Sequence, residues 1–315
     1  MVTCSPLGEE ILSVRMRQPP KWTQFYRFPV VTTVSLLSIG FTIAWWCKID
    51  VGLMFETAMI RRGEIWRLFT SILLHASLLH LVFNIYWFWI FGTIVEEVFG
   101  HLKTVVLISV LAVGSGSLEF AFASGGVGLS GVGYGFLGML WVLSSRDERF
   151  RDSVDVKTVQ LFVGWFFFCV FTTLMKWFPV ANVAHGAGAV LGISIGFAIS
   201  SPRVRTSASA AVVSILVLGL WGSTLGRPRI NRSAYGGYEE GKWGYDALVA
   251  GRNEEAIRWF RDALTYKPRL AAYWFDLGIA YQKMGKAREA HEAYQRAQQL
   301  EPAKAEYADA ATHTQ

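Results

Sequence analysis

Residues 128–138 read GLSGVGYGFLG and open an apolar run that continues as MLWVL at residues 139–143. In water this segment would be a poor helix, because each glycine weakens a helix by about 1 kcal/mol relative to alanine. In a membrane, the backbone must satisfy its own hydrogen bonds, and small residues let neighbouring helices approach closely. Gly131 and Gly135 lie four residues apart. The segment therefore predicts a membrane helix with a smooth packing face and with Ser130 at its N-terminal end.

A second glycine-rich stretch, residues 184–196, reads AHGAGAVLGISIG. Gly188 and Gly192 are four residues apart, so they lie on one helical stripe that His185 precedes by three residues. Two glycine-faced helices can pack closely enough for Ser130 to hydrogen-bond His185, which is the minimal nucleophile and base of covalent hydrolysis. The alternative is structural: an intramembrane serine often bonds to its own helix, and a lone histidine is often part of the packing.

A third stretch carries polar side chains into an apolar helix. His80 and Asn84 are four residues apart and therefore share one helical face. Such donors are costly in a membrane helix unless they face a polar cavity. Donors aimed at a developing oxyanion would explain both residues, and hydrogen bonding between helices is the alternative. His75, just before this helix, is interpreted as structural support.

Together these motifs resemble the rhomboid family of intramembrane serine proteases over roughly residues 50–200. The resemblance implies that Ser130 and His185 form a catalytic dyad, with Tyr134 packed against the imidazole. It also implies that His80, Asn84 and the backbone N–H of Ser130 form the oxyanion hole. The remaining candidate residues are glycines: Gly128 and Gly131 as supports of the dyad, and Gly135, Gly188 and Gly192 as helix-packing residues.

Composition also indicates a membrane protein. Hydrophobic residues make up 52% of the 315-residue chain and charged residues only 17%, against roughly 25% charged in soluble domains. The net charge of +6 is modest and predicts no nucleic-acid partner. Cys4, Cys47 and Cys169 lie far apart without metal-ligand spacing, so we expect inert thiols, no metal and no cofactor.

The apolar blocks predict seven membrane helices. Six of them form a core like that of the rhomboid family, and residues 207–226 form a seventh span that is long enough to cross a bilayer. Glu119 lies near the far end of the third span and is interpreted as structural. Positive charges before the first span predict a cytoplasmic N-terminus, and seven spans then place the C-terminal part on the opposite side.

The C-terminal part is a different kind of domain. Residues 273–302 fit the tetratricopeptide pattern W-x2-L-G-x2-Y…A-x3-F…P, and a shift back by 34 residues finds a second match. The shifted match includes Gly244, Gly251 and Phe260. Two repeats are fewer than the three that such arrays usually need, so docking, self-association or a partner is expected to complete them.

The fold class is therefore all-α, a polytopic membrane helix bundle followed by a soluble helical repeat domain. The expected divisions are a cytoplasmic tail at 1–27, a membrane core at 28–206, a seventh span at 207–226, a linker at 227–236, two repeats at 237–304 and a capping helix or tail at 305–315.

The function that the resemblance implies is intramembrane serine endopeptidase activity on transmembrane protein substrates. The alternative is a catalytically inactive, rhomboid-like protein that binds membrane clients and carries the repeats as an interaction module. In both cases the partners are the lipid bilayer, a transmembrane protein and an unknown protein or peptide bound by the repeats. The expected location is a bacterial cytoplasmic membrane, with the repeats extracytoplasmic.

Overall fold

The structure is a computed structural model that describes residues 20–231, 233 and 235–313. Every regular element among these residues is helical, which confirms the predicted all-α class. Apart from the short segment Phe122–Ser124, the described residues up to Thr224 form a membrane unit, and those from Leu225 onward form a repeat unit. Most of the predicted N-terminal tail, residues 1–19, lies outside the described residues.

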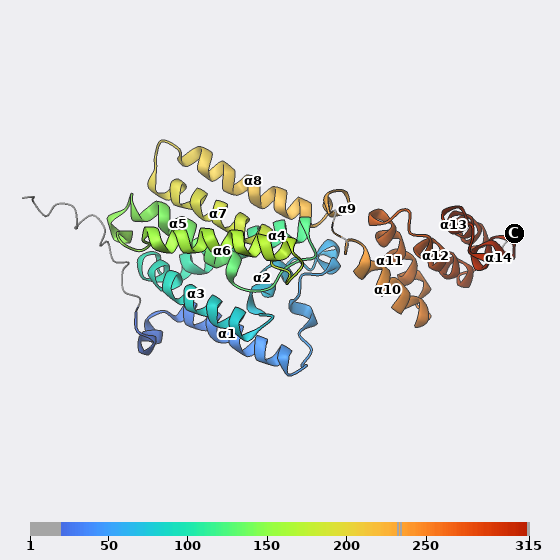
Figure 1. Cartoon of the computed structure of the whole chain (residues 1–315), viewed down its shortest axis with the longest axis horizontal. Coiled ribbons are helices and arrows are strands. Elements are labelled where there is room, and N and C mark those ends of the chain that lie inside the picture. Colours follow the sequence, from blue (N-terminus) through green and yellow to red (C-terminus); the bar gives the residue numbers. More distant parts are fainter. Residues whose placement is uncertain (1–19, 232, 234, 314–315) are drawn as a thin grey trace, which may run out of the picture. The chain divides into compact units, whose positions relative to one another are not determined.

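Six helices of the membrane unit are long and apolar enough to cross a bilayer, and they run alongside one another in Figure 1. They are α1 (Pro29–Trp46), α3 (Leu78–Phe99), α4 (His101–Phe122), α6 (Val156–Leu174), α7 (Asn182–Ser200) and α8 (Arg205–Ser223). A seventh apolar helix, α5 (Ser130–Ser144), has 15 residues. At 1.5 Å per residue it is about 22 Å long, which is shorter than the roughly 30 Å hydrocarbon core of a bilayer.

The connections between these helices contain short helical turns. The α-helical turn is α2 (Arg67–Thr70), and the 3₁₀ turns are Trp22–Arg27, Gly52–Met54, Ala58–Arg62, Ser71–Leu73 and Glu148–Phe150. Three of these turns and α2 lie between α1 and α3, so this connection is ordered and compact rather than an open loop.

Helices α5 and α7 pack backbone against backbone. A Cβ atom built on Gly188 or Gly192 of α7 would run into the carbonyl oxygens of Gly131 and Gly135 of α5. On the same interface, a Cβ on Gly138 would lie 2.6 Å from the carbonyl oxygen of Ala189. Because the obstacles are backbone atoms, no side chain can move aside, and only glycine allows this separation between the two helices.

Helix α3 packs against both α1 and α5. Phe88 of α3 and Phe136 of α5 are fully buried, and their rings stack with centroids 6.0 Å apart. At its C-terminal end, α3 supplies the buried carboxylate of Glu96, which accepts the backbone N–H groups of Val30 and Val31 at 2.9 Å each. These two bonds satisfy two of the N–H groups at the start of α1 that have no partner within the helix.

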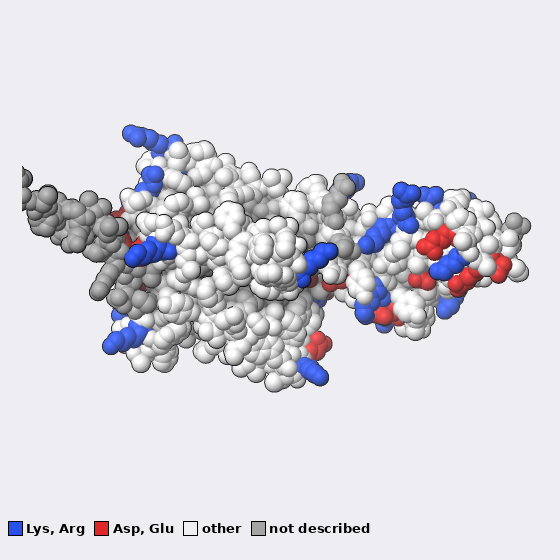
Figure 2. Space-filling model, viewed as in Figure 1, with Lys and Arg blue, Asp and Glu red and all other residues white. Residues whose placement is uncertain are grey.

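The surface of the membrane unit is apolar along α6 and α8. Phe167 and Leu174 on α6, and Val213 and Leu218 on α8, are each more than half exposed. Figure 2 shows a broad band of this unit without charge, with Lys and Arg side chains near its ends. An exposed apolar surface of this size fits a lipid environment.

The last part of the predicted N-terminal tail is packed on the bundle. The ring of Trp22 stacks on Trp89 of α3, with centroids 4.3 Å apart. The Trp89 indole N–H donates to the carbonyl oxygen of Pro20 at 3.0 Å. Tryptophan is common where a membrane helix meets the interface, because the ring is amphipathic, and the pair anchors the chain just before α1.

The repeat unit contains α9 (Arg227–Ile230), α10 (Tyr238–Val249), α11 (Asn253–Tyr266), α12 (Ala271–Lys283), α13 (Ala287–Leu300) and α14 (Ala305–His313). Its 34-residue repeat is visible in the packing. A Cβ on Gly244 would lie 2.9 Å from the ring of Phe260, and a Cβ on Gly278 would lie 2.5 Å from the ring of Tyr294. Each repeat thus places an aromatic ring of its second helix against a glycine of its first helix.

Asp276 of α12 provides a pH-dependent prediction for the repeat unit. Burial, followed by the nearby Glu306, raises the pKa of this carboxyl group to about 6, from 3.8. The folded state therefore favours the protonated carboxyl group. The contribution of protonated Asp276 to the free energy of unfolding is complete below pH 3.8 and is lost as the pH rises through 6. Asp276→Asn, which keeps a neutral side chain, is expected to slow proteolysis of α12 in the full-length protein at pH 7.5.

In limited proteolysis with an acid-tolerant protease, the difference in proteolysis rate between Asp276→Asn and wild type should shrink as the pH falls toward 4. Asp309→Asn, at an exposed position of α14, is the matched control and should leave the proteolysis rate unchanged. Equal proteolysis of Asp276→Asn and wild type at pH 7.5 would contradict the prediction.

Candidate active site

Ser130 is the first residue of α5 and follows a glycine-rich turn. Gly128 has φ +109°, a left-handed conformation that L-residues rarely adopt. A Cβ on Gly128 would also lie 2.8 Å from the imidazole of His80. Both the backbone and the neighbouring ring therefore require glycine two residues before Ser130.

Ser130 and His185 are in direct contact. The Nε2 atom of His185 lies 2.8 Å from the Oγ atom of Ser130. His185 is in the first turns of α7 and is only 4% exposed. The close packing of α5 on α7 through their glycines is what brings two residues 55 positions apart within hydrogen-bonding distance. A serine hydroxyl bonded to an imidazole is the arrangement that allows proton removal during nucleophilic attack.

The ring of His185 is oriented by stacking. Tyr134, one turn after Ser130, lies with its ring 4.7 Å from the imidazole centroid at an interplanar angle of 23°. The Tyr134 hydroxyl donates to the carbonyl oxygen of Phe162 on α6 at 3.0 Å, which fixes the ring. Among the described residues, the Nδ1 atom of His185 has no hydrogen-bond partner. No carboxylate therefore orients this imidazole in the way that the aspartate of a serine-protease triad does.

The two expected oxyanion donors have different surroundings. The imidazole of His80, near the start of α3, packs against Gly128 and lies 5.0 Å from the ring of His75. Asn84 is one turn further along α3 and is buried, and its amide donates to the carbonyl oxygen of His80 at 2.8 Å. The structure thus brings His80 to the turn before Ser130, while the Asn84 amide is bonded to its own helix.

His75 holds the residue that precedes Ser130. Its Nε2 atom accepts the backbone N–H of Leu129 at 3.4 Å, and its Nδ1 atom lies 3.4 Å from the hydroxyl of Thr42 on α1. Burial, followed by the charge of the nearby His80, lowers the pKa of His75 to about 3. A neutral imidazole with an unprotonated Nε2 is the form that accepts the Leu129 N–H, so the pKa and the geometry agree.

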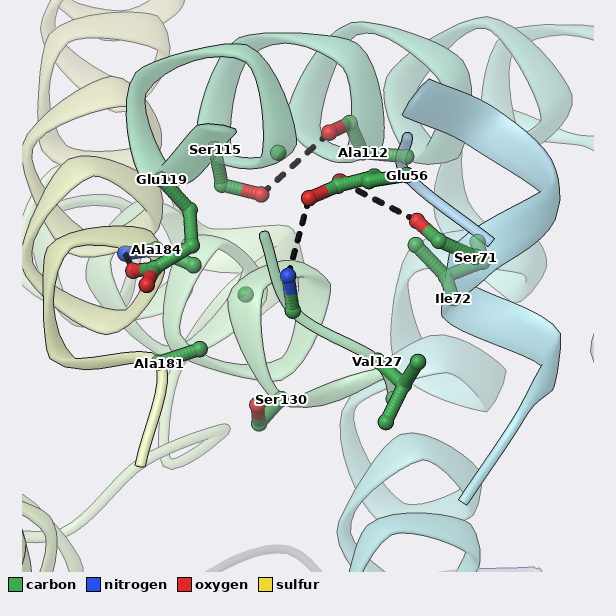
Figure 3. Close-up of a pocket in the computed structure, with 14 residues that line it drawn as sticks. Glu56, Ser71, Ile72, Ala112, Ser115, Glu119, Val127, Ser130, Ala181 and Ala184 are labelled. Carbon is green, nitrogen blue, oxygen red and sulfur yellow. Dashed lines mark hydrogen bonds between the residues drawn. The ribbon is translucent and has the colours of Figure 1, made fainter. Parts of the chain in front are cut away.

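A small cavity of about 20 Å³ opens beside Ser130 and has room for about one water molecule. Figure 3 shows Ser130 below this cavity, with Glu119 and Ser115 of α4 on one side and Glu56 and Ser71 on the other. Glu56 and Ser71 come from the connection between α1 and α3. Both glutamates are ionisable residues among apolar neighbours in the sequence, which is a signal for a functional position. Neither residue is among the site residues predicted from the sequence.

The described residues thus form a multi-pass helical membrane bundle in which a partly buried serine contacts a buried histidine. Comparison with known proteins gives the family. Residues 62–202 match the Rhomboid domain, and residues 249–285 and 271–304 match tetratricopeptide repeats. The chain therefore contains a rhomboid domain within its membrane unit, followed by tetratricopeptide repeats, and it is an integral, multi-pass membrane protein.

The curated relatives include the Rhomboid protease GlpG of Salmonella choleraesuis (strain SC-B67) and that of Salmonella newport (strain SL254). Each is 34% identical to this chain over 146 residues, which cover 44% of this chain and 50% of the relative. The chain thus spans about half the length of the curated relatives it matches.

Proposed function

We propose that this protein is an intramembrane serine endopeptidase that cleaves transmembrane protein substrates with Ser130 and His185. The observation that carries the proposal is the 2.8 Å contact between Ser130 Oγ and His185 Nε2. It is supported by the rhomboid domain at residues 62–202.

In the first step, His185 Nε2 takes the hydroxyl proton while Ser130 Oγ attacks the scissile carbonyl carbon. The tetrahedral intermediate collapses when the imidazolium gives that proton to the leaving amine, and an acyl-serine remains. Water then attacks the ester with His185 again as base, which releases the second product and restores the serine. The cavity next to Ser130 would allow water to reach the ester.

The oxyanion of the intermediate would be held by the backbone N–H of Ser130 and the side chains of His80 and Asn84. As the first residue of α5, Ser130 has an N–H group that the helix itself does not use. The Asn84 amide must rotate away from the carbonyl oxygen of His80 to reach the oxyanion. A donor of this kind contributes about 3 kcal/mol to transition-state stabilisation when it is correctly aimed.

The proposed setting is a bacterial cytoplasmic membrane with the N-terminus in the cytoplasm. If α8 crosses the bilayer, the repeats lie on the opposite, extracytoplasmic side. The repeats would bind a protein or peptide, and the substrate would be a membrane protein whose helix unwinds locally near small or helix-breaking residues.

The test is cleavage and active-site labelling by the purified full-length protein in liposomes. A fluorophosphonate probe should label Ser130, as mapped by mass spectrometry of the modified peptide. A single-pass protein with glycine or proline in its transmembrane helix should be cut, giving a new N-terminus within or beside that helix. Binding of this protein with neither labelling nor cleavage would replace the enzyme proposal with the inactive, client-binding alternative.

A further inference from the structure

Two buried glutamates face the cavity beside Ser130. Glu56 is 6% exposed and Glu119 is 4% exposed, and Figure 3 shows them on opposite sides of the cavity. Burying a carboxylate in a membrane protein is costly unless hydrogen bonds compensate it. The hydrogen-bond donors around each carboxylate therefore indicate its role.

Glu119 connects α4 to the start of α7. Its Oε2 atom accepts the backbone N–H of Ala184 at 3.0 Å. Ala184 is the third residue of α7 and directly precedes His185. The first N–H groups of a helix have no partner within the helix, and a negative charge there also interacts favourably with the helix dipole. Glu119 thus fixes the position of the turn that carries the base.

Glu56 connects the α1–α3 segment to the turn that carries the nucleophile. Its Oε2 atom accepts the backbone N–H of Gly126 at 2.9 Å, and its Oε1 atom accepts the hydroxyl of Ser71 at 3.1 Å. The carbonyl oxygen of Ser71 in turn accepts the N–H of Gly128 at 3.2 Å. Two of the residues just before Ser130 are therefore tied to the same short segment.

Space for the Glu56 carboxylate is provided by glycines. A Cβ on Gly116 of α4 would lie 2.6 Å from Glu56 Oε1, and a Cβ on Gly125 would lie 3.0 Å from the Glu56 side chain. Gly125 also has φ +97°, so the turn needs glycine there for two reasons. The carboxylate therefore occupies a site that the surrounding backbone is shaped to leave open.

From these contacts, and resting on the function proposed above, we infer that Glu56 and Glu119 are a pair of positioning residues for the dyad. Glu56 sets the place of Ser130 through the turn before α5, and Glu119 sets the place of His185 through the first turn of α7. Among the described residues, no acid contacts Nδ1 of the His185 imidazole. Its distance from Ser130 therefore depends on how the backbones of α5 and α7 are held. Neither glutamate touches the reacting atoms.

The experiment compares Met and Gln substitutions at three buried glutamates in the full-length protein in detergent micelles. Met has nearly the length of Glu but offers only a weakly accepting sulfur, whereas Gln keeps one acceptor oxygen. The third position, Glu96, is the matched control, because its buried carboxylate accepts N–H groups at the start of α1, away from the dyad. The measurements are the second-order rate of labelling by a fluorophosphonate probe, kcat and KM for a single-pass substrate, and the melting temperature.

Glu56→Met and Glu119→Met are each expected to lower the labelling rate and kcat by roughly 10- to 100-fold, because small displacements of reacting groups are that costly. KM should stay within about threefold, since the substrate-binding surface is not changed. The Gln variants should recover most of the lost rate. Glu96→Met should lower the melting temperature but leave the labelling rate of the folded protein close to that of wild type.

A labelling rate of Glu119→Met or Glu56→Met equal to that of wild type would overturn the inference for that residue. An equal loss in folded Glu96→Met would also overturn it, because the effect would then be general destabilisation. If a Met variant does not fold, Glu119→Asp or Glu56→Asp replaces it: the charge remains but the carboxylate is one methylene too short. A wild-type rate in the Asp variant would then refute the positioning role.

Labelling and cleavage by the wild-type protein show whether a failure concerns the positioning role or the proposed function. If wild type is neither labelled nor able to cleave any substrate, the proposed function fails and the inference falls with it. If wild type is active and the substitutions have no effect, only the positioning role is wrong.

Discussion

Ser130→Ala and His185→Ala are each expected to reduce the rate of substrate cleavage by roughly 10⁴-fold or more, because nucleophile and base act as one unit in covalent hydrolysis. Ser130→Ala removes the atom that forms the acyl bond. His185→Ala leaves the hydroxyl without the group that takes its proton, which lies 2.8 Å away in the wild type.

The double variant gives a sharper test than either single variant. If the two side chains work only together, Ser130→Ala/His185→Ala should be about as inactive as each single variant rather than showing the product of two losses. The measurement is kcat/KM for one transmembrane substrate in liposomes, with single-turnover time courses long enough to detect slow cleavage.

Ser194→Ala is the matched control for the serine. Ser194 lies on α7 and is partly exposed, and its hydroxyl donates to the carbonyl oxygen of Val190 in its own helix. Its removal should leave cleavage within about twofold of wild type, because a back-bonded helix serine contributes little to packing or chemistry. Cleavage by Ser130→Ala at a rate near wild type would show that the proposed mechanism is wrong.

Gly192→Ala is the second substitution with a large expected effect, in this case on stability. The new methyl group would run into the carbonyl oxygen of Gly135, and backbone atoms cannot rotate away as a side chain can. The helices α5 and α7 would have to separate, so we expect the free energy of unfolding to fall by about 3 kcal/mol. Unfolding in mixed micelles with increasing denaturing detergent, followed by circular dichroism, measures this change.

The same separation should affect the active site. Ser130 and His185 sit at the beginning of these two helices, so a wider interface lengthens the contact between their side chains. The labelling rate of the folded Gly192→Ala protein should therefore drop as well, by about 10-fold or more.

Gly133→Ala is the control on the facing helix. A Cβ built on Gly133 would meet no atom within 4 Å, unlike a Cβ built on the interface glycines. This substitution should leave stability unchanged or raise it by up to about 1 kcal/mol, because alanine favours the helix over glycine. A Gly192→Ala protein as stable as Gly133→Ala would mean that the two helices are not held as closely as the structure indicates.

Much of the site could be predicted from the sequence because its parts are local. The glycine spacing at 131/135 and at 188/192 identifies two packing faces, and each face begins next to a polar residue, Ser130 or His185. The 34-residue repeat could also be predicted from the sequence. In the structure, Gly244 and Gly278 pack against aromatic rings at equivalent positions of the two repeats. These patterns depend only on helical periodicity and repeat length, which are properties of neighbouring positions along the chain.

The contacts that hold the site together could not be predicted in the same way. The sequence suggested donors at His80 and Asn84, but only the structure shows the Asn84 amide bonded to the carbonyl oxygen of His80. From the sequence alone, Glu119 is recognisable as an ionisable residue near the end of an apolar span, but its partner is not. Its bond to Ala184 joins residues 65 positions apart, and no local pattern encodes that separation.

The sequence by itself thus determined the all-α membrane class, the repeats and the two glycine faces, because periodicity and composition alone limit which helices form and which faces can approach. The tertiary structure decided the distance between Ser130 and His185, the stacking of Tyr134 on the imidazole and the donors of Glu56 and Glu119. These features depend on how α4, α5, α7 and the connection between α1 and α3 pack together. These segments are far apart in the sequence, so their relative positions are set only by the tertiary structure.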